Sequence, residues 1–130
     1  MKRIAAIALV LCLLCGLAGC STDSAPEGAR RFTFRVIHED GSRKVYQVTA
    51  SVEEPLAETL VRHGIVEESA ENDGLYDVVD GERADWDDGM AWWCFRKDGQ
   101  PLTVGIEDVV PENGAVYEAV FSHGYGDMGA

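Results

Sequence analysis

Residues 91–99 read AWWCFRKDG and contain two adjacent tryptophans. The aromatic residues of this stretch favour a β-strand, and the Asp-Gly pair that closes it favours a tight turn. Adjacent residues of a strand point to opposite faces, so Trp92 and Trp93 cannot both enter one core. Either Trp93 with Phe95 or Trp92 with Cys94 is buried, and the other tryptophan faces solvent, a covering loop or a ligand.

The start of the domain predicts a β-hairpin. Residues 32–38 and 44–50 each alternate apolar and polar side chains. The turn between them, residues 39–42, contains an Asp-Gly pair. Two alternating runs on either side of such a pair are a strong local signal for a hairpin.

The hairpin is followed by a segment with helical spacing. Within residues 53–63, Leu56, Leu60 and His63 recur at i, i+4 and i+7, and a glycine comes directly afterwards. Pro55 suits the first helical turn, and glycine suits the position just past a helix end. We therefore predict a helix of about three turns with one apolar stripe facing the hairpin.

The rest of the domain predicts loops and short strands. In chain order these are an acidic loop at 67–74, a strand at 75–80, a loop at 82–90, the aromatic strand at 91–97, an extended piece around 102–104 and a last strand at 115–122. Strands on both sides of one helix predict an α+β fold, a β-grasp-like mixed sheet with one packed helix.

The N-terminus has the pattern of a processing signal. Lys2 and Arg3 precede an apolar run at 4–18, which is shorter than the ~20 residues that span a bilayer. The run ends in LAGC, which resembles the lipobox of bacterial lipoproteins. We expect a signal peptide at 1–19, lipidation of Cys20, and anchoring to the cell membrane on its extracytoplasmic side. A plain secretory signal or an uncleaved anchor remain the alternatives.

Composition then excludes several classes of function. The chain has 130 residues and a formal charge of -12, and removal of 19 residues with two basic side chains leaves 111 residues at -14. A chain of this length is too short for a two-domain enzyme. We expect a lipidated cysteine and tether at 20–31, a single domain at 32–122 and a flexible tail at 123–130. So acidic a surface repels nucleic acids. Of the four cysteines, only Cys94 would remain as a free thiol.

No catalytic or metal motif stands out. The acidic run at 85–89 lacks the EF-hand pattern, and we expect a solvated turn there. His38, His63 and His123 form no recognisable ligand pair. Cys94 between aromatic residues is typical of a small buried side chain. We therefore expect no enzyme, no metal site and no cofactor.

Several short motifs together resemble the bacterial transcobalamin-like C-terminal domain family. They are Gly74–Tyr76, Val79–Gly81, Trp92–Phe95, Asp98–Gly99, Val104–Asp108 and Asn113–Gly114. Their order and spacing extend over residues 32–122. Cys94 and Asp98 stand where the family usually has an aromatic residue and an asparagine.

The resemblance implies a non-enzymatic cell-surface binding module, with a corrinoid-like compound as its candidate ligand. In the vertebrate cobalamin carriers that the family resembles, such a domain covers one face of a corrinoid held jointly with a helical domain. Stacking by tryptophan and close approach to a glycine backbone would supply the contacts. The expected ligand-binding residues are Tyr76, Trp92, Trp93, Phe95, Gly105 and Ile106. The alternative is an interaction or adaptor domain that presents a sheet edge or its aromatic face to an envelope or transporter protein.

Overall fold

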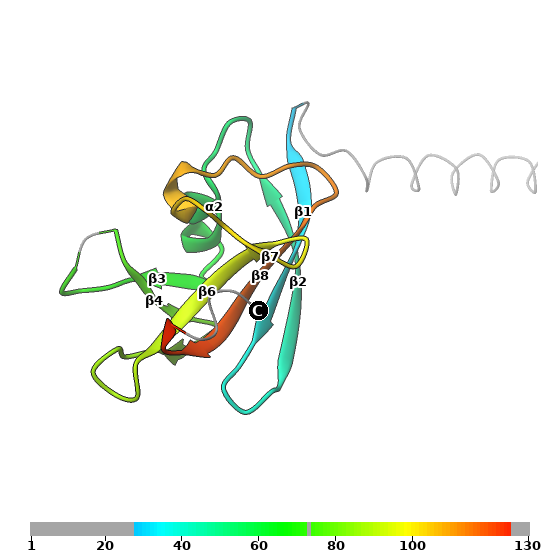
Figure 1. Cartoon of the computed structure of the whole chain (residues 1–130). Coiled ribbons are helices and arrows are strands. Elements are labelled where there is room, and N and C mark those ends of the chain that lie inside the picture. Colours follow the sequence, from blue (N-terminus) through cyan, green and yellow to red (C-terminus); the bar gives the residue numbers. More distant parts are fainter. Residues whose placement is uncertain (1–27, 73, 126–130) are drawn as a thin grey trace, which may run out of the picture.

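The computed structural model describes residues 28–72 and 74–125 (Figure 1). The predicted signal peptide and Cys20 lie outside this part. The elements are β1 (Arg30–Ile37), β2 (Arg43–Ala50), α2 (Leu56–Arg62), β3 (Val66–Glu68), β4 (Tyr76–Val79), β5 (Glu82–Arg83), β6 (Ala91–Lys97), β7 (Gln100–Pro101), the 3₁₀ helix η1 (Ile106–Asp108) and β8 (Val116–His123). No helix in the described part is long and apolar enough to cross a membrane.

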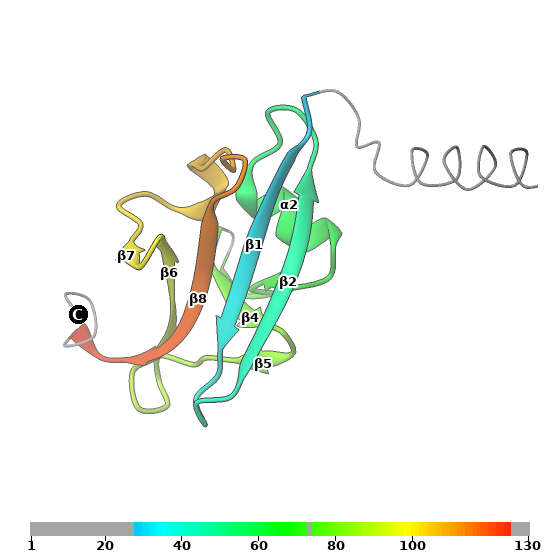
Figure 2. The same ribbon diagram turned by 90° about the vertical axis from the view of Figure 1, so that its right-hand side faces the viewer.

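The strands form two sheets. The larger has the order β2-β1-β8-β6-β7, and the smaller has the order β3-β4-β5. β1 pairs parallel with β8, while the other neighbours in the larger sheet are antiparallel. Helix α2 and the smaller sheet lie on one face of the larger sheet (Figure 2). The predicted α+β class, with a β-grasp-like mixed sheet and a packed helix, is confirmed.

Buried and half-buried side chains alternate along β1, and the buried ones form part of the hydrophobic core. Phe32, Phe34 and Val36 of β1 are buried, whereas the residues between them are only half-buried. Phe34 lies between Tyr46 of β2 and Tyr117 of β8 in the register. The inward side chains of three strands thus form one apolar surface, on which α2 packs.

Two Asp-Gly turns close the short hairpins as the sequence predicts. Asp80 and Gly81 have φ of 48° and 79°, and Asp98 and Gly99 have φ of 49° and 83°. Positive φ at both central residues is the signature of the turn that matches the twist of a two-residue hairpin. These turns connect β4 to β5 and β6 to β7.

Helix α2 is shorter than the sequence predicts. It begins at Leu56 because Pro55, with ψ of 150°, is extended and occupies the N-cap position rather than the first turn. Its buried stripe is Leu56, Ala57, Thr59 and Leu60, whereas His63 is exposed at the C-cap. Gly64 ends the helix with φ of 71°, as expected.

Three further boundaries differ from the sequence prediction. Glu67 and Glu68, placed in an acidic loop, belong to β3, because Val66 is buried and pairs opposite Val79. Residues 82–83 form β5 instead of loop. β7 lies at Gln100–Pro101 instead of around residue 103, because the turn at Asp98–Gly99 returns the chain at once to pair with Arg96 and Lys97.

Phe34 tests this account of the core. It is fully buried, so Phe34→Ala should lower the free energy of unfolding by about 3–5 kcal/mol in urea denaturation. Val45→Ala is the control, because Val45 is exposed on edge strand β2, and should cost less than about 1 kcal/mol. Equal losses in the two variants would contradict the assigned faces.

Candidate functional site

The six predicted ligand-binding residues line one cavity of about 400 Å³. Three of them are the aromatic residues of β6, and Tyr76 comes from β4. Gly105 and Ile106 come from the start of η1. The cavity therefore lies where the larger sheet, the smaller sheet and η1 meet.

Packing around η1 fixes one wall of the cavity. The Ile106 side chain is buried in the core. At the far end of η1, the carbonyl of Val109 accepts a hydrogen bond from the backbone N–H of Leu56, at 2.6 Å. The first residue of α2 thus holds the segment that carries Gly105.

The two adjacent tryptophans have different environments. Trp93 is the core residue, with 5% of its surface exposed, and its indole N–H donates to the carbonyl of Glu82 at 3.1 Å. It also packs edge-on against Phe121, with ring centroids 5.2 Å apart. Trp92, on the opposite face, is half-buried and donates to the carbonyl of Gly124 at 3.0 Å. The start of β5 therefore covers Trp93, and the tail contacts Trp92.

Both tryptophans reach the cavity because it lies at a strand edge. β7 pairs only with Arg96 and Lys97. In the described part, no strand pairs with the outer edge of β6 from Ala91 to Phe95. Side chains from both faces of β6 can therefore contribute to the same hollow.

The mouth of the cavity is partly apolar and partly acidic. Leu75 and Trp86 line it and are 52% and 41% exposed. Asp77 and Glu107 supply two carboxylates. Burial, and then the charges of Glu68 and Glu107, raise the pKa of the Tyr76 hydroxyl. Sequence reasoning did not place these four lining residues at the site, because they lie on different loops and strands.

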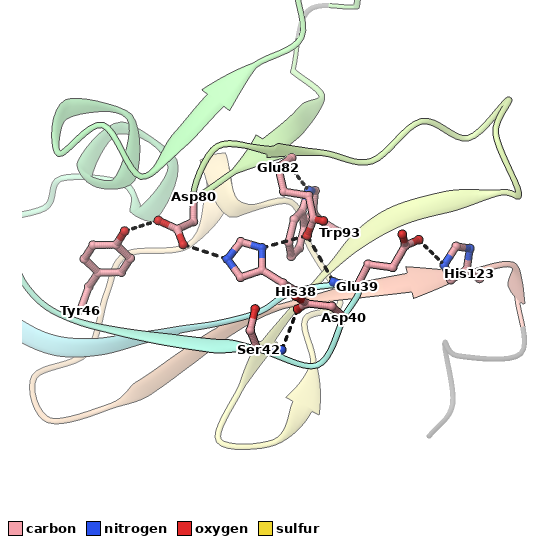
Figure 3. Close-up of polar contacts among 9 residues, drawn as sticks. All are labelled: His38, Glu39, Asp40, Ser42, Tyr46, Asp80, Glu82, Trp93 and His123. Carbon is pink, nitrogen blue, oxygen red and sulfur yellow. Dashed lines mark hydrogen bonds and ion pairs between the residues drawn. The ribbon is translucent and has the colours of Figure 1, made fainter.

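A histidine held by two carboxylates lies beside Trp93 (Figure 3). The His38 Nδ1 contacts Glu82 Oε1 at 2.8 Å, and its Nε2 contacts Asp80 Oδ2 at 2.8 Å. The Tyr46 hydroxyl donates to the other oxygen of Asp80. Both ring nitrogens therefore face acceptors, and only the imidazolium can donate to both.

We name this cluster the His38 clamp (His38, Asp80, Glu82 and Tyr46). Its hydrogen bonds stabilise the charged forms of His38 and Asp80. Burial lowers the pKa of His38, but the hydrogen bonds to Asp80 and Glu82 outweigh burial and raise it overall. Burial raises the pKa of Asp80, but hydrogen bonds from Tyr46 and His38 lower it overall. Burial and the Asp80 contact raise the pKa of Tyr46 to about 12.

The clamp joins the β1–β2 turn to the β4–β5 turn. The backbone N–H of Glu39 also donates to Glu82, at 3.2 Å. Since Glu82 receives the indole N–H of Trp93 on its carbonyl, the clamp fixes the strand that covers this tryptophan. The sequence showed no sign of it, because His38 and Asp80 are far apart in the chain.

The other candidate residues are not gathered at the cavity. Cys94 is buried and free, as expected for a small buried side chain. The predicted pairing of Trp93 with Phe95, or of Trp92 with Cys94, is wrong, because Trp93 and Cys94 are buried from opposite faces while Trp92 and Phe95 are half-buried. His63 contacts the Thr49 carbonyl, and His123 contacts Glu39. Among the residues described, no group of three His, Cys, Asp or Glu side chains could hold a metal ion.

The solved structures that share this fold include two that bear on the site. A Ruminococcus gnavus protein, provisionally described as metal-binding, superposes with a TM-score of 0.66 at 26% identity, covering 74% of this chain and 99% of that one. Haptocorrin, a cobalamin carrier, in complex with Cbi superposes with a TM-score of 0.60 at 17% identity, covering 80% of this chain. The match extends over 27% of haptocorrin. No family model and no curated protein matches the sequence.

These neighbours link the chain to a fold found in binding proteins. The haptocorrin similarity is one of fold alone, since a fold hosts many unrelated sites. What this chain binds must therefore be argued from its own cavity.

The His38 clamp predicts how stability depends on pH. Because the folded-state pKa of His38 is raised, the charged His38 stabilises the folded state. This stabilisation is fully present below about pH 6.5 and is lost as pH rises through the folded-state pKa. The pH dependence from Asp80 has the opposite sign. Because the pKa of Asp80 is lowered in the folded state, its stabilisation of the fold is lost on acidification below about pH 4.

The measurement is the urea midpoint of the wild type and of His38→Gln from about pH 5 to about pH 9. The wild type should lose stability on the alkaline side more steeply than the variant. Parallel profiles would show that His38 is not held as an imidazolium.

Proposed function

We propose that this chain is a lipid-anchored, non-enzymatic binding module on the extracytoplasmic side of the cell membrane, and that its cavity takes an organic ligand, or part of one, with an apolar body. One observation carries the proposal: side chains from β4, β6 and η1 converge on one cavity of about 400 Å³. That volume lies at the lower end of the ~300–1,000 Å³ typical of ligand pockets.

The chemistry of the lining favours binding. Five of its side chains are aromatic, namely Tyr76, Trp86, Trp92, Trp93 and Phe95. Aromatic surfaces supply large contact areas at little cost in conformational entropy. Of the two carboxylates, Asp77 is held in an ion pair with Arg83 at 3.3 Å. An apolar floor with few polar groups is suited to holding a ring rather than to transforming it.

A corrinoid is the ligand that we propose for the first test. The shared fold with haptocorrin supports this choice at the level of fold alone. A corrin ring with its side chains exceeds a cavity of about 400 Å³, so the domain would cover one face or one edge of the ligand. We therefore expect weak binding by this chain alone and tighter binding with a second protein over the exposed face.

A protein partner is the second candidate function. Val104 and Leu75, both 52% exposed, and Trp86 lie around the cavity and its neighbouring hollow. An exposed apolar rim around an aromatic floor is typical of a surface that another molecule covers. An envelope protein that pairs with the outer edge of β6 would bury the same residues.

Cobalamin titration tests the small-molecule proposal. The full chain in a non-ionic detergent should show saturable tryptophan quenching, corrected for absorption by cobalamin, with a dissociation constant between micromolar and millimolar. Trp92→Ala should weaken binding by about tenfold, because a central aromatic contact contributes on the order of 1–2 kcal/mol. Val45→Ala should bind like the wild type, since Val45 lies on edge strand β2, outside the cavity lining.

Absence of saturation up to millimolar cobalamin would contradict the corrinoid version. A pull-down of an envelope protein that depends on Trp92, without binding of cobalamin, would instead favour the adaptor function. Since both candidate functions depend on Trp92, they are separated by whether cobalamin or an envelope protein is the molecule that binds.

The membrane anchor has its own test. The chain should incorporate a labelled fatty acid and sediment with membranes, whereas Cys20→Ser should do neither, because the acylated thiol is lost. The predicted tether at 20–31 ends earlier in the structure, because β1 begins at Arg30. Residues 21–29, when extended at ~3.3–3.6 Å per residue, keep the domain within about 30–32 Å of the bilayer. Membrane association of Cys20→Ser equal to that of the wild type would contradict lipidation at this residue.

A further inference from the structure

We infer that the cavity selects a positively charged organic ligand, an ammonium or similar cation with an apolar body, over neutral and anionic molecules of the same shape. This inference rests on the proposed binding function and specifies the charge of its ligand. It is carried by two features of the cavity together, its aromatic lining and the sign of the charges around it.

The charges around the cavity have one sign. Among the described residues that line it, Asp77 and Glu107 are acidic and none is Lys, Arg or His. A neighbouring hollow of about 310 Å³ shares Tyr76 and Glu107 and adds Glu58 and Glu68, again with no basic side chain. The hollow on the other side, around Leu102, is lined by apolar and uncharged residues.

Glu107 is the carboxylate that most directly faces a ligand. Asp77 is already paired with Arg83, whereas no ion pair of Glu107 is found within the described ranges. Its carboxylate folds back over the backbone of Gly105, where a Cβ would collide with it. Glu107 therefore lies at the wall that we expect a ligand to approach, with its charge uncompensated by protein.

The aromatic lining favours the same sign of charge. The face of an aromatic ring is electrostatically negative, so a cation within about 6 Å of a ring is attracted, most strongly by tryptophan. Three tryptophans, a tyrosine and a phenylalanine line this cavity. Because these rings line the cavity together with the Glu107 carboxylate, we expect an anion to bind less favourably than a cation, while a neutral molecule would gain only apolar contact.

The test uses two probes of the same shape that differ in charge. Choline and 3,3-dimethyl-1-butanol differ by replacement of the quaternary nitrogen with carbon. Their binding to the full chain in a non-ionic detergent is followed by the indole N–H resonances of the tryptophans, with empty micelles as the blank. Choline should bind at least about fivefold more tightly, and added salt should reduce its affinity without affecting the alcohol.

Glu107→Gln should reduce the preference for choline by about fivefold, because one nearby charge contributes on the order of 1 kcal/mol in a partly solvated site. Glu71→Gln is the matched control, since it removes the same charge from an exposed residue outside the cavity lining. It should change choline binding by less than about twofold.

The possible failures are distinct. Equal affinity for the two probes, without salt dependence, would overturn the charge selectivity and leave the binding function standing. Loss of the preference in Glu71→Gln as much as in Glu107→Gln would show a net-charge effect and would also overturn the inference. If neither probe nor cobalamin binds, the binding function fails and the inference fails with it.

Discussion

The parallel pairing of β1 with β8 determines where the other elements lie. The register joins Thr33 to Val116 and continues to Ile37 opposite Val120, at the centre of the larger sheet. Parallel strands cannot be joined by a tight turn, so the chain between them must cross over the sheet. Helix α2 and the smaller sheet lie on the same face as a result (Figure 2), and the cavity forms where the smaller sheet and η1 meet β6.

The edge position of β6 and the His38 clamp then shape the site. Because β8 occupies one side of β6 and the short β7 pairs only with its last residues, no strand of the described part pairs with the other edge of its aromatic part, where loop residues bond Ala91 and Phe95. The clamp holds the β4–β5 turn against the first hairpin, so that the carbonyl of Glu82 binds the indole of Trp93. One tryptophan is thereby fixed in the core beside the cavity, while Trp92 lines it from the other face.

Local patterns predicted the elements, and long-range contacts account for what they missed. The alternation around Phe34 and the two Asp-Gly turns, Asp80–Gly81 and Asp98–Gly99, depend on residues that are close in the chain. These strands and turns could therefore be predicted from the sequence. β3 was missed because Glu67 and Glu68 look like loop until Val66 pairs with Val79. The His38 clamp and the position of Glu107 depend on side chains brought together only by the fold. The six predicted site residues share a cavity, and their role in binding stays a prediction.

The central claim is that this cavity is where the chain binds small molecules. Residue-resolved NMR of the full chain during a screen of small aromatic, apolar and cationic fragments tests it without assuming one ligand. Shifts should concentrate on Tyr76, Trp92, Phe95 and Gly105. Shifts that concentrate instead in the groove beside Arg62 and His63, or that scatter over the surface, would contradict the account.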